Sequence, residues 1–221
     1  MKKVDYLANR YKIIQDSDLY RFTSDSILLS RFVTAQKDEV VADFCAGGGV
    51  VGLNFFAENE GVSSVTFFEE QKELATLCRA SINLNGLQDK MKVECMRLQD
   101  IPAQYVEKFS LILCNPPFES GGFESADPKK AACKKELSLT LDELIQSAKR
   151  CLKFGGKFVV CHRADRSAEL ICALHAAGLE PKLMQFVSGR TGKDPYLVLI
   201  AAKKGARPHV QVLSEKVNEG D

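Results

Sequence analysis

Short apolar runs rich in Val, Ile and Phe alternate along this chain with stretches in which apolar residues recur every three or four positions. The first pattern predicts buried β-strands and the second predicts helices. Seven strands are expected, at Val40–Phe44, Ser64–Phe68, Lys92–Cys95, Phe109–Cys114, Lys157–Cys161, Lys182–Val187 and Tyr196–Ala202. Because parallel strands need long crossover connections, usually helical, the alternation predicts an α/β fold with a mostly parallel sheet covered by helices on both faces.

Two helices are marked most clearly. In the first, over residues 141–152, Thr140 and Glu143 have the spacing of a capping box, and Gly155-Gly156 is expected to end the helix. The second is expected to run from Asp165, as its N-cap, to Gly178.

The last two expected strands are separated only by a short polar segment between Val187 and Tyr196. This segment is too short for a crossover helix, so these strands are expected to form a C-terminal antiparallel hairpin. The tail from about Lys203 is polar enough to fray.

Composition narrows the class of protein. Of the 221 residues, 45% are apolar and 27% charged, which is typical of one globular domain and excludes disorder. The net charge of +1 neither requires a polyanionic partner nor excludes a locally basic face. The eight cysteines contain no CxxC pair, which argues against a metal site and favours reduced thiols in a cytoplasmic protein. The longest apolar stretch is far shorter than the roughly 20 residues that span a bilayer, so no membrane partner is expected.

The first chemical motif follows the first strand directly. It is Asp43-Phe-Cys-Ala-Gly47-Gly48-Gly49-Val-Val-Gly52, a literal GxGxxG that opens a helix. Such a turn lets the backbone approach a ligand and directs helix N-terminal N–H groups toward it. Glu69, at the end of the second strand, is placed to accept hydrogen bonds from ribose hydroxyls, either in a dinucleotide enzyme or in a methyltransferase. A glycine-rich turn without a ligand is the alternative.

The second motif, Asn115-Pro116-Pro117-Phe118, follows the fourth strand. Two prolines fix φ and remove two backbone donors, so the loop presents carbonyls and a side-chain amide in a stiff arrangement. We expect the Asn115 side-chain oxygen and the Pro116 carbonyl to accept the N–H bonds of an amine substrate, and Phe118 to stack on a planar base. A rigid turn that merely ends a strand is the alternative.

With both motifs in place, the sequence resembles the class I S-adenosylmethionine-dependent methyltransferases of the amino-nitrogen (NPP[FY]) group, which have a Rossmann-like fold. More narrowly, it is similar to the bacterial tRNA1(Val) (adenine(37)-N6)-methyltransferase family, which modifies the adenine beside the anticodon of a valine tRNA. The narrower resemblance covers about residues 10–203 and is carried by Tyr11-Lys-Ile-Ile-Gln15, Phe22-Thr-Ser-Asp25-Ser-Ile-Leu-Leu29, Glu69-Glu-Gln71, Asn83-Leu-Asn85 and Gln99-Asp100-Ile101.

The resemblance implies a set of cofactor-binding residues: Thr23, Ser24, Asp25, Asp43, Cys45, Gly47, Gly48, Gly49, Glu69, Glu70, Asp100, Ile101 and Asn115. Asp43 and the glycines would hold the methionine portion of S-adenosylmethionine, and Glu69 the ribose. Asp100 would bind the adenine amino group, with Ile101 beside the ring. Residues 23–25 would close over the cofactor. Asp25 as a helix N-cap, Asp100 as a turn residue and Glu69 as a solvated charge are the alternatives.

The resemblance also implies a division of the chain and a substrate. Residues 1–35 would be an N-terminal segment closing over the cofactor, 36–203 the methyltransferase domain, and 204–221 a polar tail. The partner would be RNA, most simply tRNA, bound by a monomer without metal. Basic residues near the site are candidates for phosphate contacts: Lys134 and Lys135, with Lys129, Lys130, Arg163, Arg166, Arg190 and Lys193. Solvated lysine-rich loops are the alternative.

Four interpretations therefore compete. An RNA adenine-N6 methyltransferase leads. The same chemistry on another planar amine, such as a DNA adenine, an rRNA guanine or a release-factor glutamine, would use the same Asn-Pro-Pro-Phe loop. A nicotinamide-dependent oxidoreductase would explain the glycine motif but not that loop. A noncatalytic module that binds S-adenosylmethionine or RNA is the non-enzyme alternative.

Overall fold

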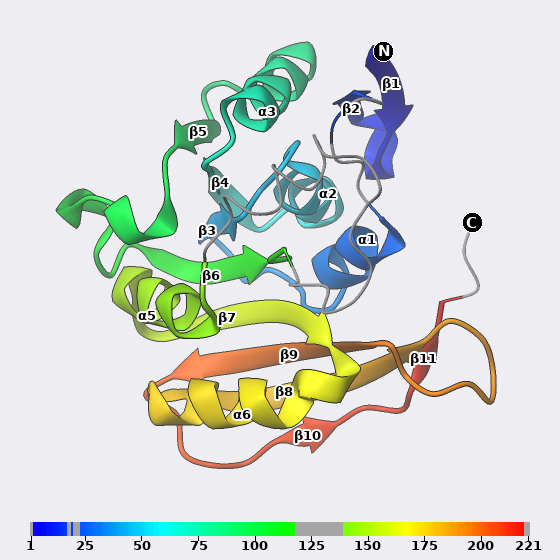
Figure 1. Ribbon diagram of the computed structural model, residues 1–221. Helices are drawn as coiled ribbons and strands as arrows, with labels where there is room; N and C mark the ends of the chain where they lie inside the picture. Colours follow the sequence, from blue (N-terminus) through cyan, green and yellow to red (C-terminus); the bar gives the residue numbers. More distant parts are fainter. Residues whose placement is uncertain (1, 17–18, 20–22, 118–138, 219–221) are drawn as a thin grey trace.

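The computed structural model of the chain describes residues 2–16, 19, 23–117 and 139–218, and it is built around one large twisted sheet (Figure 1). The strands are β1 (Lys2–Tyr6), β2 (Lys12–Asp16), β3 (Glu39–Phe44), β4 (Val62–Glu69), β5 (Met91–Cys95), β6 (Phe109–Cys114), β7 (Leu152–Arg163), β8 (Leu179–Ser188), β9 (Leu197–Lys204), β10 (Gln211–Val212) and β11 (Lys216–Val217). The α-helices are α1 (Ser24–Ser30), α2 (Val50–Glu58), α3 (Lys72–Leu84), α5 (Leu141–Cys151) and α6 (Ser167–Ala176).

The main sheet has the order β10-β8-β9-β7-β6-β3-β4-β5, with β11 also paired to β8. The strands from β5 to β7 are mutually parallel, whereas β9 is antiparallel to both β7 and β8. The seven predicted strands are all present, as β3 to β9, and they end in the predicted antiparallel hairpin. The predicted fold class is therefore confirmed, with two short strands added at one edge.

Alternate residues of the central strands face opposite layers of helices. Val41, Leu111 and Val159 pack with residues of α1, α2 and α3, while their neighbours Ala42 and Ile112 pack with residues of α5 and α6. Strands buried on both faces are continuous apolar runs, which is the pattern that the sequence shows. The helices therefore cover both faces of the sheet, as predicted.

Helix α5 begins with the predicted capping box. The Thr140 hydroxyl accepts from the Glu143 N–H at 3.2 Å, and the Glu143 carboxylate accepts from the Thr140 N–H at 2.9 Å. The predicted end at Gly155-Gly156 is wrong, because Leu152 already pairs with Phe109 in the sheet. Both glycines therefore lie inside β7, where the register shifts and Gly155 adopts a φ of +77°.

The predicted start of α6 is also wrong. The helix begins at Ser167, and Asp165, whose carboxylate is paired with the Arg163 guanidinium, is not its N-cap. A 3-10 turn over Ala164–Arg166 precedes the helix and makes Arg166 its N-cap. The helix ends at Ala176, just before Gly178, whose φ of +77° fits the expected stop.

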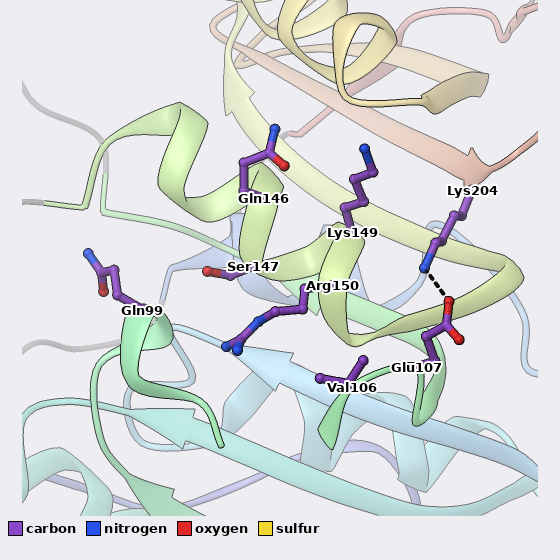
Figure 2. Close-up of a pocket in the computed structure, with 8 residues that line it drawn as sticks. All are labelled: Gln99, Val106, Glu107, Gln146, Ser147, Lys149, Arg150 and Lys204. Carbon is purple, nitrogen blue, oxygen red and sulfur yellow. Dashed lines mark hydrogen bonds and ion pairs between the residues drawn. The ribbon is translucent and has the colours of Figure 1, made fainter. Parts of the chain in front are cut away.

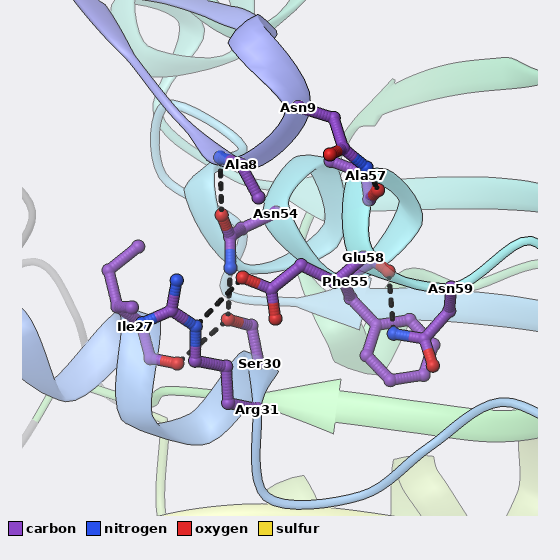
Figure 3. A network of polar contacts seen from close by, with 10 residues as sticks. All are labelled: Ala8, Asn9, Ile27, Ser30, Arg31, Asn54, Phe55, Ala57, Glu58 and Asn59. Carbon is purple, nitrogen blue, oxygen red and sulfur yellow. Dashed lines mark hydrogen bonds and ion pairs between the residues drawn. The ribbon is translucent and has the colours of Figure 1, made fainter.

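The N-terminal hairpin of β1 and β2 lies on the helical layer (Figure 3). The Asn54 side chain of α2 accepts from the Ala8 N–H at 3.2 Å and donates to the Ser30 hydroxyl of α1 at 2.9 Å. Further along, the Ile14 N–H donates to the Ser81 hydroxyl of α3 at 2.9 Å. One asparagine thus joins the hairpin, α2 and α1 into a single layer.

The C-terminal segment does not fray as expected over its described residues. Both β10 and β11 pair in parallel with β8, which would otherwise be an open edge of the sheet with unpaired backbone groups. Pairing with β8 therefore orders this segment, although its polar sequence alone does not predict strands. None of the helices in the described ranges is long and apolar enough to cross a membrane.

Candidate active site

The candidate site lies at the carboxyl ends of the central parallel strands. The strand order reverses at β3, which has β4 on one side and β6 on the other. In open α/β sheets this switch point creates a crevice outside the strand ends, where ligands bind. Asp43 lies at the end of β3, Glu69 ends β4, and Asn115 follows β6 directly.

The glycine loop is shaped by two requirements. Gly49 has a φ of +88°, which favours glycine, and a Cβ built there would lie 2.5 Å from the Cys78 sulfur. Both the backbone conformation and the lack of space therefore require glycine at this position. At Gly47, whose φ is +55°, a Cβ would meet nothing within 4 Å. The loop is therefore packed against α3 at Gly49 and open at Gly47, where a ligand can approach the backbone.

Asp43 is fully buried beneath this loop. One carboxylate oxygen accepts from the Gly52 N–H at 2.9 Å, and the other, Oδ1, has no hydrogen-bond partner among the described residues. Burial raises the pKa of Asp43 to about 7, the Gly52 hydrogen bond lowers it, and the nearby charge of Glu69 raises it. An unsatisfied buried carboxylate oxygen calls for a donor or a cation, and an ammonium group supplies both.

Glu69 is also buried, and both of its carboxylate oxygens accept backbone N–H bonds. The donors are Gly47 at 2.7 Å and Gln71 at 2.8 Å. Burial raises the pKa of Glu69, and these two hydrogen bonds lower it in part. Because each carboxylate oxygen has two lone pairs, both can still accept hydroxyl protons of a ribose.

Asn115 lies where α1, β6 and β7 meet. Its side-chain N–H donates to the Ser26 hydroxyl at 3.0 Å, and its side-chain oxygen accepts from the Cys161 thiol at 3.0 Å. Pro116 is buried and Pro117 is exposed. Phe118, Lys134 and Lys135 lie outside the described residues, as do Lys129 and Lys130.

Asp100 and Ile101 come from a short 3-10 turn that α5 holds in place. The Arg150 guanidinium donates to the Ile101 carbonyl at 2.6 Å, and the Ser147 hydroxyl to the Leu98 carbonyl at 3.4 Å. Ile101 is buried and Asp100 is exposed. The depression drawn in Figure 2 is away from the carboxyl ends of the strands, and it contains the Lys204–Glu107 ion pair at 3.1 Å.

Thr23, Ser24 and Asp25 form the start of α1, with Thr23 at the N-cap and Asp25 inside the first turn, so Asp25 is not a cap. The Asp25 carboxylate accepts from the Tyr196 hydroxyl at 2.7 Å. The Asn218 side chain donates to the Ser24 hydroxyl and to the Tyr196 oxygen, both at 2.8 Å. Residues near both ends of the described chain thus meet beside Asn115.

The remaining predicted site residues flank the strand ends. Cys45 is half-buried with a φ of +56°, an uncommon conformation for a residue other than glycine. The Glu70 carbonyl accepts from the Cys95 thiol at 3.7 Å. Within the described ranges there is no group of three or more His, Cys, Asp or Glu residues that could hold a metal ion.

The candidate phosphate-binding residues differ in their surroundings. Arg163 is paired with Asp165, and Arg166 with Glu169. Arg190 and Lys193 are exposed in the segment between β8 and β9, which leads directly to Tyr196. The segment that carries this second pair ends at Tyr196, whose hydroxyl contacts Asp25 at the start of α1.

The sequence does not predict the place of four residues at the site: Ser26, Cys161, Tyr196 and Asn218. Ser26 falls inside the segment at residues 22–29 that resembles the family, and this is the one signal that could have pointed to it. In the sequence, Cys161 is simply one residue of an apolar strand. Their proximity to the predicted residues depends on the strand order.

The strand order with its antiparallel β9, the glycine loop and the two buried carboxylates fit the fold of a class I methyltransferase. The family model for the methyltransferase small domain matches residues 22–176. The chain therefore belongs to the methyltransferase small domain family and is an S-adenosylmethionine-dependent methyltransferase. A nicotinamide-dependent oxidoreductase is excluded on the same ground.

Curated relatives extend along most of the chain. A tRNA1(Val) (adenine(37)-N6)-methyltransferase of Dickeya chrysanthemi is 19% identical over 209 residues, covering 95% of this chain and 83% of the relative. An enzyme of the same name from Cronobacter sakazakii is 23% identical over 202 residues, covering 91% and 82%.

Solved structures share the fold. The crystal structure of a predicted O-methyltransferase from Agrobacterium tumefaciens has a TM-score of 0.68 at 22% identity, covering 87% of this chain and 86% of that one. TYW2 of P. horikoshii in complex with MeSAdo has a TM-score of 0.65 at 16% identity, covering 93% and 72%.

Proposed function

We propose that the protein is a cytoplasmic RNA methyltransferase that transfers a methyl group from S-adenosylmethionine to the N6 amino group of an adenine, in tRNA near the anticodon. The observation that carries the proposal is the position of Asn115, which follows β6 beside the switch point and begins a loop of two prolines. The relatives named tRNA1(Val) (adenine(37)-N6)-methyltransferase support the choice of substrate.

The residues present fit the cofactor. The buried Oδ1 of Asp43, which has no partner in the part of the chain that the structure describes, suits the cationic amino group of the methionine portion. The open space at Gly47 admits the chain of the cofactor, and Glu69 is placed for the ribose. The turn carrying Asp100 and Ile101 would take the adenine. The Met96 N–H donates to the Glu69 carbonyl at 3.1 Å, which keeps the segment leading to this turn beside the ribose residue.

Bound S-adenosylmethionine supplies a methyl group already activated on a sulfonium. The protein then has to position and desolvate the attacking nitrogen. The Asn115 side-chain oxygen and the Pro116 carbonyl would accept hydrogen bonds from the two N–H groups of the amine, which would leave the nitrogen lone pair free to attack. The nitrogen–methyl bond would form as the sulfur–methyl bond breaks, and the methylated amine would then lose one proton to water. As positive charge develops on nitrogen, both acceptors bind the transition state more strongly than the substrate.

Substrate binding would use residues around this loop. Phe118 would stack on the base, and Lys134, Lys135, Arg190 and Lys193 would contact phosphates. We propose a division into an N-terminal segment closing over the cofactor (1–35), a methyltransferase domain (36–203) and a polar tail (204–221). Asp25 and Ser24 would contribute to that closure from α1.

The test is to incubate the protein with radiolabelled S-adenosylmethionine and, separately, with unmodified tRNA, rRNA, DNA and protein extract. Label recovered as N6-methyladenosine from tRNA is the expected result. Label only in an rRNA guanine, a DNA adenine or a protein glutamine would overturn the substrate while keeping the chemistry. Binding of S-adenosylmethionine without transfer to any acceptor would overturn catalysis.

A further inference from the structure

We propose that Ser26 and Cys161 are positioning residues that together hold the side-chain amide of Asn115 with its oxygen directed for acceptance from the substrate amine. The proposal rests on the proposed function, in which Asn115 accepts an N–H bond of the adenine amino group. It assigns a task to two residues outside the cofactor-binding set and outside the Asn-Pro-Pro-Phe loop.

The contacts come from both sides of the amide. Ser26, in α1, is 2% exposed and accepts from Asn115 Nδ2 at 3.0 Å. Cys161, in β7, is fully buried and donates to Asn115 Oδ1 at 3.0 Å. The other acceptor near this sulfur, the Cys114 carbonyl, is at 4.0 Å, so the Asn115 oxygen is the better partner. α1 and β7 therefore hold the Asn115 side chain from two sides.

The two residues do not contribute equally to the orientation. A serine hydroxyl donates or accepts equally well, so Ser26 would satisfy the amide in either of its two flipped states. A thiol is a weak acceptor, and Cys161 stays a thiol because burial raises its pKa well above the usual value. Only the observed orientation, with the oxygen toward sulfur, lets this proton be donated to Asn115, and the remaining acceptor, the Cys114 carbonyl, is more distant at 4.0 Å. Cys161 therefore determines which way the Asn115 amide faces, and Ser26 restrains the amide in that orientation.

The orientation matters for the chemistry of the loop. An amide oxygen has two lone pairs, so Oδ1 can accept from Cys161 and from a substrate N–H at once. A flipped amide would instead present its NH₂ group to the amine, and donors would face donors. The flipped state is thus unproductive, and each lost restraint lowers the productive fraction of the enzyme.

The experiment compares Cys161→Ala, Cys161→Ser and Ser26→Ala with the wild type. For Cys161→Ala we expect kcat for tRNA methylation to fall about tenfold, since one weak orienting hydrogen bond is lost. The Kd for S-adenosylmethionine should change less than twofold. Cys161→Ser should restore most of kcat, because a hydroxyl also donates. Ser26→Ala should lower kcat with the cofactor Kd likewise retained.

The serine variant separates positioning from packing. A buried serine is less favourable in an apolar site than alanine, so a purely structural role would make Cys161→Ser the worse variant. Cys151 supplies the matched control: it is equally buried but lies at the junction of α5 and β7, away from Asn115. Cys151→Ala and Cys151→Ser should leave kcat unchanged.

A readout without turnover keeps this proposal distinct from the proposed function. In the ¹⁵N-labelled protein, the Asn115 side-chain amide is the NH₂ pair missing from the spectrum of Asn115→Asp. That pair should shift or broaden in Cys161→Ala and Ser26→Ala, and should be unchanged in the Cys151 variants. An unchanged pair in both site variants, or equal kcat for Cys161→Ala and wild type, would overturn the proposal. Failure of the wild type to methylate RNA would overturn the proposed function instead.

Discussion

The carboxylate of Glu69 accepts a hydrogen bond at 2.7 Å from the backbone N–H of Gly47. This bond ties the end of β4 to the glycine loop that follows β3. Glu69 therefore shapes the glycine loop, and in the proposed cofactor complex it would also offer its oxygens to the ribose. Cofactor affinity should depend on this one side chain more strongly than a single ribose contact would suggest.

We expect Glu69→Ala to weaken S-adenosylmethionine binding by about two orders of magnitude, because two buried backbone N–H groups also lose their acceptor. Glu69→Gln should weaken it by about tenfold, since an amide can accept on one side only. Calorimetric titration with S-adenosylmethionine measures both. Glu73→Ala, an exposed change in the first turn of α3, is the control and should bind normally.

Asn115→Ala should lower kcat by about two orders of magnitude, as expected for loss of a group that binds the transition state. The Kd for S-adenosylmethionine should stay within a few-fold of the wild type. Single-turnover transfer and calorimetry on the same preparation give the two values. A comparable loss of cofactor binding would show that the role assigned to Asn115 is wrong.

Asp43 should make folding stability depend on pH. Its pKa is raised from 3.8 to about 7, so between these values the folded state holds a proton that the unfolded state has released, and stability falls as pH rises. Asp43→Asn removes this dependence while keeping an acceptor for the Gly52 N–H. Relative to the variant, the free energy of unfolding of the wild type without cofactor should fall by about 3 kcal/mol between pH 5 and pH 8. Urea unfolding at the two pH values measures this loss, and parallel pH profiles would contradict the assignment.

Gly49→Ala should destabilise the protein by more than about 2 kcal/mol, because left-handed strain adds to a Cβ placed 2.5 Å from the Cys78 sulfur. Gly86→Ala is the matched control, since Gly86 has a φ of +66° with open space around it. Gly86→Ala should lower the free energy of unfolding by about 1 kcal/mol, the cost of the left-handed backbone alone. Thermal or urea unfolding compares the two. Equal losses would mean that the loop moves freely away from α3.

The double reversal Arg190→Glu/Lys193→Glu should raise the KM for tRNA about tenfold or more with little change in kcat. It should also make the KM less sensitive to salt, because phosphate contacts are lost. The control Lys149→Glu/Lys153→Glu changes charge equally at the junction of α5 and β7, which lies at the other end of β7 from its pairing with Leu197. An equal effect of both pairs would indicate only a general charge effect.

The core of the fold could be predicted because parallel strands buried on both faces form continuous apolar runs, as at Phe109–Cys114. The N-terminal hairpin and the strands β10 and β11 could not, because their residues are largely polar and they are stabilised by docking onto elements distant in the chain. The start of α6 could not be predicted from its sequence because a 3-10 turn over Ala164–Arg166 precedes the helix and contains the expected cap residue Asp165.

The residues of the candidate site likewise fall into those that could be predicted from the sequence and those that could not. Asp43, Glu69 and Asn115 could be predicted because each stands at the end of a recognisable strand. Ser26 and Cys161 could not, since nothing local distinguishes a serine inside a helix or a cysteine inside an apolar strand. They meet Asn115 only because the strand order brings α1 and β7 to it.

The bond between Ser24 and Asn218 joins residues 194 positions apart, and that between Asp25 and Tyr196 joins residues 171 apart. Loops of this length carry a large closure entropy, so such contacts form after shorter-range ones. During refolding, α1 should therefore dock on α2 first, through the Asn54–Ser30 bond, and its first residues should meet Tyr196 and Asn218 later. We expect circular dichroism of the refolding chain to reach its native value before these two long-range contacts form.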